Sequence, residues 1–211
     1  MSNVLKLNSK NCPVGEFQFA AITGAGMYNE DKEANEYKVT LQLDMDEHSA
    51  LMDEIDDFVE DNAVKGKTLH SVGYQTHEDY DGIPEGKFWI QAKTATEFEG
   101  KDGVKAVNVN IYDATGNKCT LPDGVGIGKG STGIIIGQFK IWDRKKEYGC
   151  SLYLSGAQIA DFIPHEFESA PEAIGTGSFK GFDNNKSDLE KAEEPEQETS
   201  TRPRRSRRGS R

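Results

Sequence analysis

Residues 88–94 read Phe-Trp-Ile-Gln-Ala-Lys-Thr, and apolar side chains alternate there with polar or amphipathic ones. A period of two is typical of a β-strand, in which successive side chains point to opposite faces of a sheet. One face carries a phenylalanine, an isoleucine and an alanine, which fit a hydrophobic core. The opposite face carries Trp89, Gln91 and Lys93, so the stretch predicts a strand with one core face and one face suited to a ligand.

Three later runs, 107–112, 135–142 and 151–154, repeat this alternation. Four such strands side by side would form a sheet with a shared outer face. The aromatic and basic side chains expected on that face are Trp89, Lys93, Tyr112, Lys140, Trp142 and Tyr153. The alternative is that a helix or a second sheet covers these rings. Trp142 is the strongest candidate for exposure, because the charged run 143–146 follows it, where a strand would turn into solvent.

The first half of the chain predicts two more strands and one helix. Residues 17–23 and 37–43 alternate like strands, and an amphipathic stripe of apolar residues at helical spacing predicts a helix over about 47–63, with Asp44 or Asp46 as N-cap. Segment 65–86 has the composition of a loop with one short strand, and the glycine-rich run 124–130 predicts a flexible connection.

The distribution of charge predicts a polyanion as ligand. The chain carries a formal net charge of -11, yet residues 87–153 hold ten basic and seven acidic side chains, a local balance of +3. Nine acidic residues fall within 44–61, which has no lysine or arginine, and would repel a polyanion from that side. Because a ligand responds to the local field, global acidity does not exclude nucleic acid.

Motifs for catalysis, a metal or a cofactor are not apparent. His70 and His77 lie near acidic residues, but no nucleophile or oxyanion motif accompanies them. The acidic run 44–48 lacks the spacing and the glycine of a calcium loop. The glycine-rich run 124–130 matches neither the phosphate-loop nor the dinucleotide-binding pattern. The three cysteines, which are far apart in sequence, favour reduced thiols over a zinc knuckle or a disulfide framework. We therefore expect no enzyme, no cofactor and no metal site.

Length and composition predict one main domain. We expect an N-terminal segment at 1–15, a domain at 16–170 and a disordered tail at 171–211, acidic first and then rich in arginine. No apolar run approaches the roughly 20 residues of a membrane span, and the first 15 residues lack a signal peptide's apolar centre. The expectation is a soluble, cytoplasmic protein without membrane contact.

Aromatic rings beside lysines are suited to single-stranded nucleic acid. Rings stack on bases of any sequence at about 1 to 3 kcal/mol per base, and basic side chains follow the phosphates. The residues expected to bind are Trp142, Lys140, Trp89, Lys93, Tyr112, Tyr153, Lys129 and Arg144.

The order of these elements resembles the single-stranded DNA-binding proteins of tailed bacteriophages. The resemblance covers roughly residues 17–162 and rests on Glu36–Leu41, the acidic helix, Phe88–Ile90, Val107–Val109, Gly128–Ser131 and a long strand ending at Trp142. It implies a mainly β protein with a five-stranded OB-fold barrel, an inserted amphipathic helix and no catalysis. It also implies that the protein coats and protects single-stranded DNA in phage replication and recombination, in the cytoplasm of the infected bacterium. Trp142 matches the family's stacking aromatic, and Lys93 and Lys140 match its sheet lysines.

The tail departs from that family's pattern. Members typically end in an acidic segment that recruits replication proteins and competes with DNA; here the acidic stretch 188–198 is followed by six arginines within 202–211. We expect these arginines to add a phosphate contact and the acidic part to recruit partners. Two other functions stay open, an RNA-binding OB module and an acidic phage protein whose sheet face binds a host protein. The oligomeric state stays open too, with a homodimer as one alternative.

Overall fold

The structure is a computed structural model that describes residues 4–101, 103–122 and 125–166. All of these lie in the first of two compact units, Met1–Glu168. The second unit, Ser169–Arg211, lies outside the described residues, and so do the predictions made for the tail. The domain limits drawn from the sequence remain predictions.

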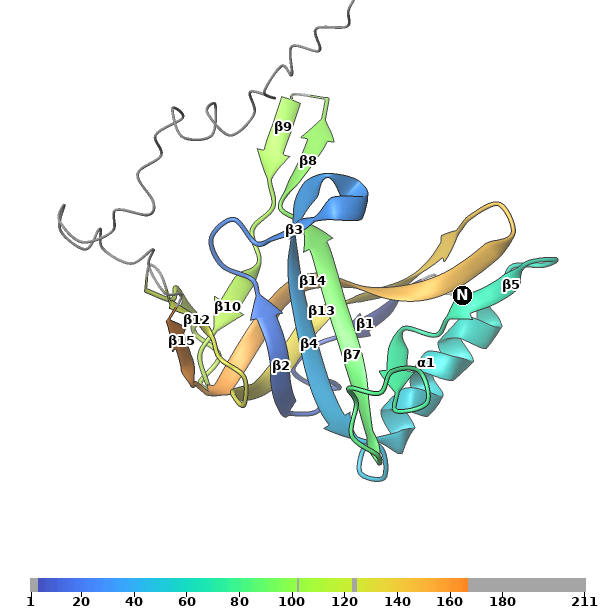
Figure 1. The fold of residues 1–211 in the computed structure, drawn as a ribbon, viewed down its shortest axis with the longest axis horizontal. Coiled ribbons are helices and arrows are strands. Elements are labelled where there is room, and N and C mark those ends of the chain that lie inside the picture. The colour runs from blue at the N-terminus through green and yellow to red at the C-terminus, as the bar shows by residue number, and fades with distance from the viewer. Residues whose placement is uncertain (1–3, 102, 123–124, 167–211) are drawn as a thin grey trace, which may run out of the picture. The chain divides into compact units, whose positions relative to one another are not determined.

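Five strands pair in a closed ring, and Figure 1 shows their arrangement. They are β2 (Gly15–Ala21), β4 (Ala34–Asp44), β7 (Lys87–Ala95), β13 (Thr132–Asp143) and β14 (Glu147–Asp161). The pairing order is β2-β4-β7-β14-β13 and back to β2, with β7 and β14 parallel and every other pair antiparallel. Only two residue pairs join β13 to β2, and only two join β7 to β14, so these are the shortest ladders of the ring. This topology confirms the predicted mainly β, OB-like fold.

Shorter elements decorate the ring. They are β1 (Leu5–Leu7), β3 (Met27–Asn29), the 3₁₀ helix η1 (Glu30–Lys32), β5 (Thr68–Ser71), β6 (Tyr74–Thr76), β8 (Glu97–Gly100), β9 (Gly103–Ala106), β10 (Asn110–Tyr112), β11 (Lys118–Cys119), β12 (Val125–Ile127) and β15 (Pro164–Glu166). Strand β1 pairs with β13 and places Leu7 in the core.

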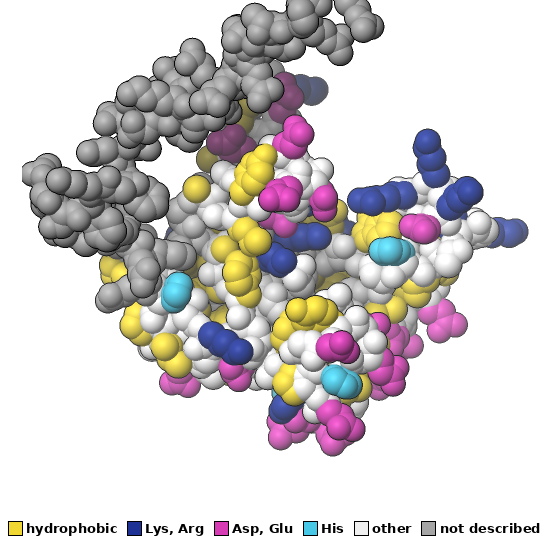
Figure 2. Space-filling view, viewed as in Figure 1, with side chains coloured by type: hydrophobic (Ala, Val, Ile, Leu, Met, Phe, Trp, Pro, Cys, Tyr) yellow, Lys and Arg dark blue, Asp and Glu magenta, His cyan; other side chains and the backbone are white. Residues whose placement is uncertain are grey.

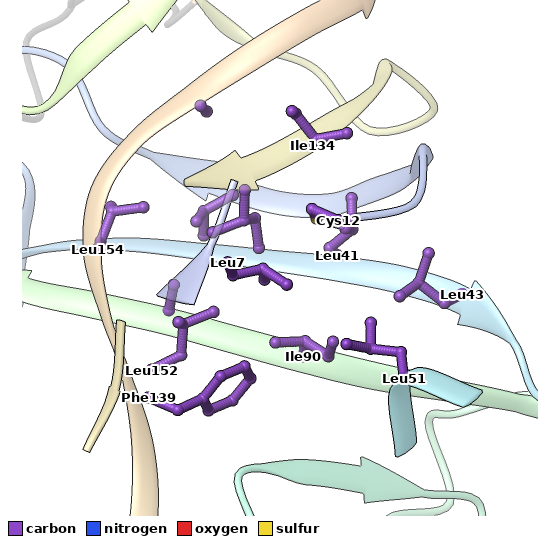
Figure 3. Packing of buried hydrophobic residues seen from close by; sticks show 14 of the residues in the cluster. Leu7, Cys12, Leu41, Leu43, Leu51, Ile90, Ile134, Phe139, Leu152 and Leu154 are labelled. Carbon is purple, nitrogen blue, oxygen red and sulfur yellow. The ribbon is translucent and has the colours of Figure 1, made fainter. Parts of the chain in front are cut away.

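The core lies inside the ring, where the inward faces of the strands meet. Alternation along each strand buries one side, and Phe17, Leu41, Ile90, Phe139 and Leu152 are each at most 1% exposed. Figure 3 shows Leu7, Leu41, Ile90, Phe139 and Leu152 gathered within one cluster. Each fully buried apolar side chain contributes roughly 1.5 to 3 kcal/mol. Because the inward faces form the core, the other face of each strand is left for the surface.

One helix, α1 (Ser49–Asp61), follows β4 and packs its apolar stripe on the same core. The stripe predicted from the sequence is confirmed, since Leu51, Ile55 and Val59 are buried. The predicted N-cap is wrong: the helix begins after His48, whose side chain makes no capping hydrogen bond. The Asp44 carboxylate instead accepts hydrogen bonds from the Asp46 and Glu47 amides, in the turn before the helix.

Local differences from the sequence predictions fall in the connections. Segment 65–86 contains two short strands, β5 and β6, and the strand expected at 107–112 begins only at Asn110. The glycine-rich run contains β12, which pairs with β15, so it is not merely a flexible connection. The charged turn after Trp142 is confirmed, because Arg144 N donates to the Glu147 carbonyl oxygen at 2.9 Å and β14 begins there.

Candidate nucleic-acid interface

The outer face of β7, β14 and β13 brings aromatic and basic side chains side by side. Register places Lys93 of β7 opposite Tyr153 of β14. On the other side of β14, Lys140 of β13 pairs with Ser151, and Trp142 pairs with Gly149. Because partners across a ladder share a face, the period of two predicted from sequence places these side chains on one surface.

A groove of about 800 Å³ lies on this face. We call it the main groove, and the side chains that matter below are Lys32, Lys93, Phe98, Trp142, Arg144 and Tyr153. Figure 2 shows Lys and Arg side chains at the β13–β14 turn, at the right, and in the hollow at the centre, with Asp and Glu over α1 at lower right and also just above the hollow. Three basic side chains, Lys32, Lys93 and Arg144, line the groove against two acidic ones, Glu36 and Glu147, so the groove has a small positive excess within an acidic molecule.

Each aromatic ring at the β13–β14 side has a cation near it. The Arg144 guanidinium lies 5.1 Å from the Trp142 ring centroid, and Lys140 Nζ lies 5.1 Å from the Tyr153 ring centroid. His70 meets Trp142 edge-on, with 5.7 Å between ring centroids. Neither ring belongs to the core, and Tyr153 is 44% exposed. These rings offer stacking surface with charge for phosphate beside it.

The turn that carries Arg144 is tied to the rest of the molecule. Lys67, which follows α1, forms an ion pair with Asp143 and donates a hydrogen bond to the Arg144 carbonyl oxygen at 2.8 Å. Trp142 lies against Gly149, because a Cβ there would come 2.5 Å from the indole. The indole is thus positioned by a glycine that leaves it room and by an anchored turn.

Lys93 is a half-buried cation of the main groove. Burial and the nearby charges of Lys32, Lys38 and Arg144 lower its pKa, and the Glu36 carboxylate offsets part of that effect. Glu36 is itself paired with Lys32, at 2.6 Å between Nζ and Oε2. Burial raises the Glu36 pKa, but the Lys32 and Asn29 hydrogen bonds and the lysine charges outweigh it, so the pKa lies below its usual value. A phosphate would relieve the repulsion around Lys93.

A second hollow, of about 460 Å³, lies beside Trp89 on the same outer face. Trp89 Nε1 donates to Gln42 Oε1 at 3.0 Å, and the Tyr80 ring lies 5.6 Å from the Trp89 ring. Phe19 also lines this hollow, and Lys38 Nζ is 5.8 Å from its ring centroid. A smaller hollow lined by Trp89 and Lys93 joins the second hollow to the main groove. The face is therefore continuous across β4, β7 and β14.

Two of the residues predicted from the sequence lie apart from this cluster. Tyr112 on β10 pairs with Gln158, five residues from Tyr153 along β14 and roughly 16 Å away at strand spacing. Lys129 lies in the turn before β13, at the opposite end of that strand from Trp142. Their assignment as binding residues stays a prediction, without support from proximity to the main groove.

Several residues of the site were missed by sequence reasoning. They are Phe19, Lys32, Lys38, His70, Tyr80 and Phe98. The alternation along β4 contained a signal for Lys38. Phe19 lies two residues after the buried Phe17, and an irregularity in the β2–β4 register between them places it on the outer face, so alternation alone would have assigned it to the core. The others lie between the ring strands, in η1, in the short strands β5 and β8 and in a turn, which are too short for a periodicity to show where a side chain points.

Among the described residues, no group of three or more His, Cys, Asp or Glu is placed to hold a metal ion. The cysteines are free, and burial raises the pKa of the Cys12 and Cys150 thiols to about 12, so both are protonated at neutral pH. Within the same residues, no helix is long and apolar enough to span a membrane.

No family model matches the sequence, and no curated protein matches it. Solved structures do match in fold. Gp2.5, a single-stranded DNA-binding protein encoded by bacteriophage T7, is 17% identical with a TM-score of 0.56, over 81% of this chain and 98% of that chain. The single-stranded DNA-binding protein from bacteriophage Enc34, in complex with ssDNA, is 15% identical with a TM-score of 0.52, over 75% and 90%. The chain therefore has the fold of phage single-stranded DNA-binding proteins, which confirms the resemblance seen in the sequence at the level of the fold.

Proposed function

We propose that this chain is a sequence-tolerant single-stranded DNA-binding protein that holds unpaired bases and phosphates in the main groove. One observation supports this most strongly. Trp142 and Tyr153 line the same groove, and each ring has a cation 5.1 Å from its centroid. Stacking on rings is tolerant of sequence, because every base has a π-face, and cations beside the rings suit the phosphates.

The position of the groove on the ring supports the proposal. OB-folds bind oligonucleotides on the face of their second and third strands and at the loops between strands one and two and between strands four and five. Here these are β4 and β7, the connection that contains Lys32, and the β13–β14 turn that carries Arg144. Each of these elements contributes a residue to the main groove, so the fold and the chemistry of the side chains indicate the same surface.

The proteins that share the fold support a proposal for the biological role. Because they come from bacteriophages T7 and Enc34, we propose that this protein coats and protects single-stranded DNA during phage replication and recombination, in the cytoplasm of the infected bacterium. We also propose that residues 171–211 recruit replication proteins and that the protein forms a homodimer. Both of these proposals are independent of DNA binding.

Titration with oligo-dT tests the proposal, with the fluorescence of Trp89 and Trp142 as the signal. We expect quenching and saturable binding, together with much weaker competition by duplex DNA, whose bases are already stacked on one another. Oligo-U RNA of the same length is the matched competitor: equal competition would favour an RNA-binding module. Absence of binding to both single strands at low salt would contradict the proposal and favour a protein interface.

A further inference from the structure

A hairpin formed by β8 and β9 stands outside the ring. Its strands pair only with each other, and Figure 1 shows it projecting beyond the end of β7. Its base is fastened to the ring: Thr96 N donates to the Asn35 carbonyl oxygen at 3.2 Å, and Val107 N donates to the Thr96 carbonyl oxygen at 2.7 Å. The hairpin is therefore an arm with a fixed base beside β4 and β7.

The two faces of the hairpin differ in chemistry. Phe98 pairs with Lys105, so an aromatic ring and an ammonium group share one face. Glu99 pairs with Val104 on the other face, where Glu97 also lies. Phe98 lines the main groove, which means that the aromatic and basic face is turned toward the groove and the acidic face away from it.

Phe98 is unusual for a phenylalanine in being 52% exposed. It lies outside the hydrophobic core, so burial on folding does not account for an aromatic ring at this position. The ring opens instead onto a groove shared with Trp142 and Tyr153. An exposed ring beside other exposed rings marks a binding surface more strongly than an isolated one.

We propose that Phe98 stacks on a nucleobase held in the main groove, which makes the β8–β9 hairpin an additional DNA-binding element. This inference rests on the proposed function and deepens it. The hairpin lies in the connection between the third and fourth ring strands, β7 and β13, outside the strands and loops that OB-folds usually present to oligonucleotides. The acidic outer face of the hairpin repels phosphates, which favours binding of the DNA along the groove side of the hairpin.

The experiment compares Phe98→Ala with Val104→Ala, which removes an exposed apolar side chain from the opposite face of the same hairpin. Each full-length variant is titrated with oligo-dT and with an abasic oligonucleotide of the same length. We expect Phe98→Ala to weaken binding to oligo-dT by about 5- to 150-fold, because one base loses its stacking partner. Binding of Phe98→Ala to the abasic strand, and binding of Val104→Ala to both strands, should match the wild type.

Three results would overturn the inference: unchanged oligo-dT affinity in Phe98→Ala, equal loss on the abasic strand, or equal loss in Val104→Ala. Each of these leaves the proposed function standing as long as the wild type binds oligo-dT; a wild type that does not bind would overturn both. If Phe98→Ala does not fold, Phe98→Trp in a background with Trp89→Phe and Trp142→Phe provides a second measurement. Quenching of that single indole by oligo-dT, but not by the abasic strand, is expected, and no quenching would contradict stacking.

Discussion

At the scale of single residues, the site combines flat rings with cations that are held in place. Trp142 lies between Arg144 and His70 and against Gly149, so its indole has little freedom before a ligand arrives. Lys93 is half-buried and held among other positive charges, and both effects lower its pKa. A nucleotide could supply a base to stack on the Trp142 ring and a phosphate to neutralise the charge of Lys93.

Trp142→Ala should lower the affinity for oligo-dT by about 1 to 3 kcal/mol, because a stacking surface is lost. The free energy of unfolding should change little, since the indole lies outside the core. Fluorescence anisotropy of labelled oligo-dT and urea unfolding measure the two quantities. Phe162→Ala is the matched control: it removes a 42% exposed aromatic ring that does not line the main groove. Equal affinities for the two variants would remove Trp142 from the site.

Glu36→Gln should lower the free energy of unfolding at neutral pH by about 1 kcal/mol, because it removes the charge that pairs with Lys32. The folded-state pKa of Glu36 lies below its usual value, so the ionised carboxylate stabilises the fold above the unfolded-state pKa. That contribution is lost as the pH falls through the folded-state pKa, and the two proteins should then converge. Urea unfolding across acidic pH checks this, with exposed Glu30→Gln as the control. A difference that persists at low pH would rule out the charge as its cause.

At the scale of elements, strand pairing decides which side chains meet. The parallel pairing of β7 with β14 joins Lys93 to Tyr153, and the antiparallel pairing of β14 with β13 brings Lys140 and Trp142 to the same face. Gly149 on β14 is the partner of Trp142 in this ladder. The glycine is required by the close approach of the ring, since a Cβ would come 2.5 Å from it and 2.8 Å from Ser71 Oγ.

Gly149→Ala should therefore displace the Trp142 indole and weaken binding to oligo-dT, although every residue proposed to contact the DNA is still present. We expect a shifted tryptophan emission maximum in the free protein and a loss of affinity smaller than that of Trp142→Ala, because the ring is moved and not removed. Ser155→Ala is the control on the same strand, at an exposed position whose change adds no atoms. Wild-type emission together with wild-type affinity in Gly149→Ala would show that the ring does not depend on this glycine.

At the scale of the whole molecule, the charges are segregated. The net charge of -11 keeps the chain acidic overall, yet the main groove and the β13–β14 turn collect basic side chains, and the acidic residues of α1 lie elsewhere on the surface. A polyanion is thus attracted to one face and repelled from another. For the proposed ligand, this arrangement would orient the polyanion before contact and make its binding sensitive to ionic strength.

The logarithm of the oligo-dT binding constant should fall with the logarithm of salt concentration with a slope of about -2, if Lys93, Lys140 and Arg144 each neutralise one phosphate at about 0.7 per contact. Lys140→Gln should reduce the magnitude of the slope by about 0.7. Lys65→Gln, which changes an exposed lysine just after α1, should leave the slope unchanged. A slope near zero for the wild type would contradict phosphate contacts altogether, and equal slopes for the two variants would exclude Lys140.

The sequence by itself indicated the five ring strands and, for β7, β13 and β14, the face to which their side chains point. Trp89, Lys93, Lys140 and Trp142 were assigned to one surface from a period of two, because that period follows from backbone geometry alone. The apolar stripe of α1 was predictable for the same reason, at a period of 3.6. The N-cap was not, because several acidic residues precede the helix and a local turn at Asp44 competes for them.

Only the tertiary structure decided which parts of the chain meet on that surface. Phe98 and Lys32 reach the main groove from a hairpin and a connection, whereas Tyr112 and Lys129, which the sequence also predicted as binding residues, lie apart from it. Strand pairing joins residues far apart in the chain, such as Lys93 and Tyr153, through backbone hydrogen bonds that every residue type except proline can both donate and accept. Side-chain alternation shows to which face of the sheet a residue points, but not which residues of other strands lie beside it. Those neighbours are set by how the strands pair and how the whole core packs.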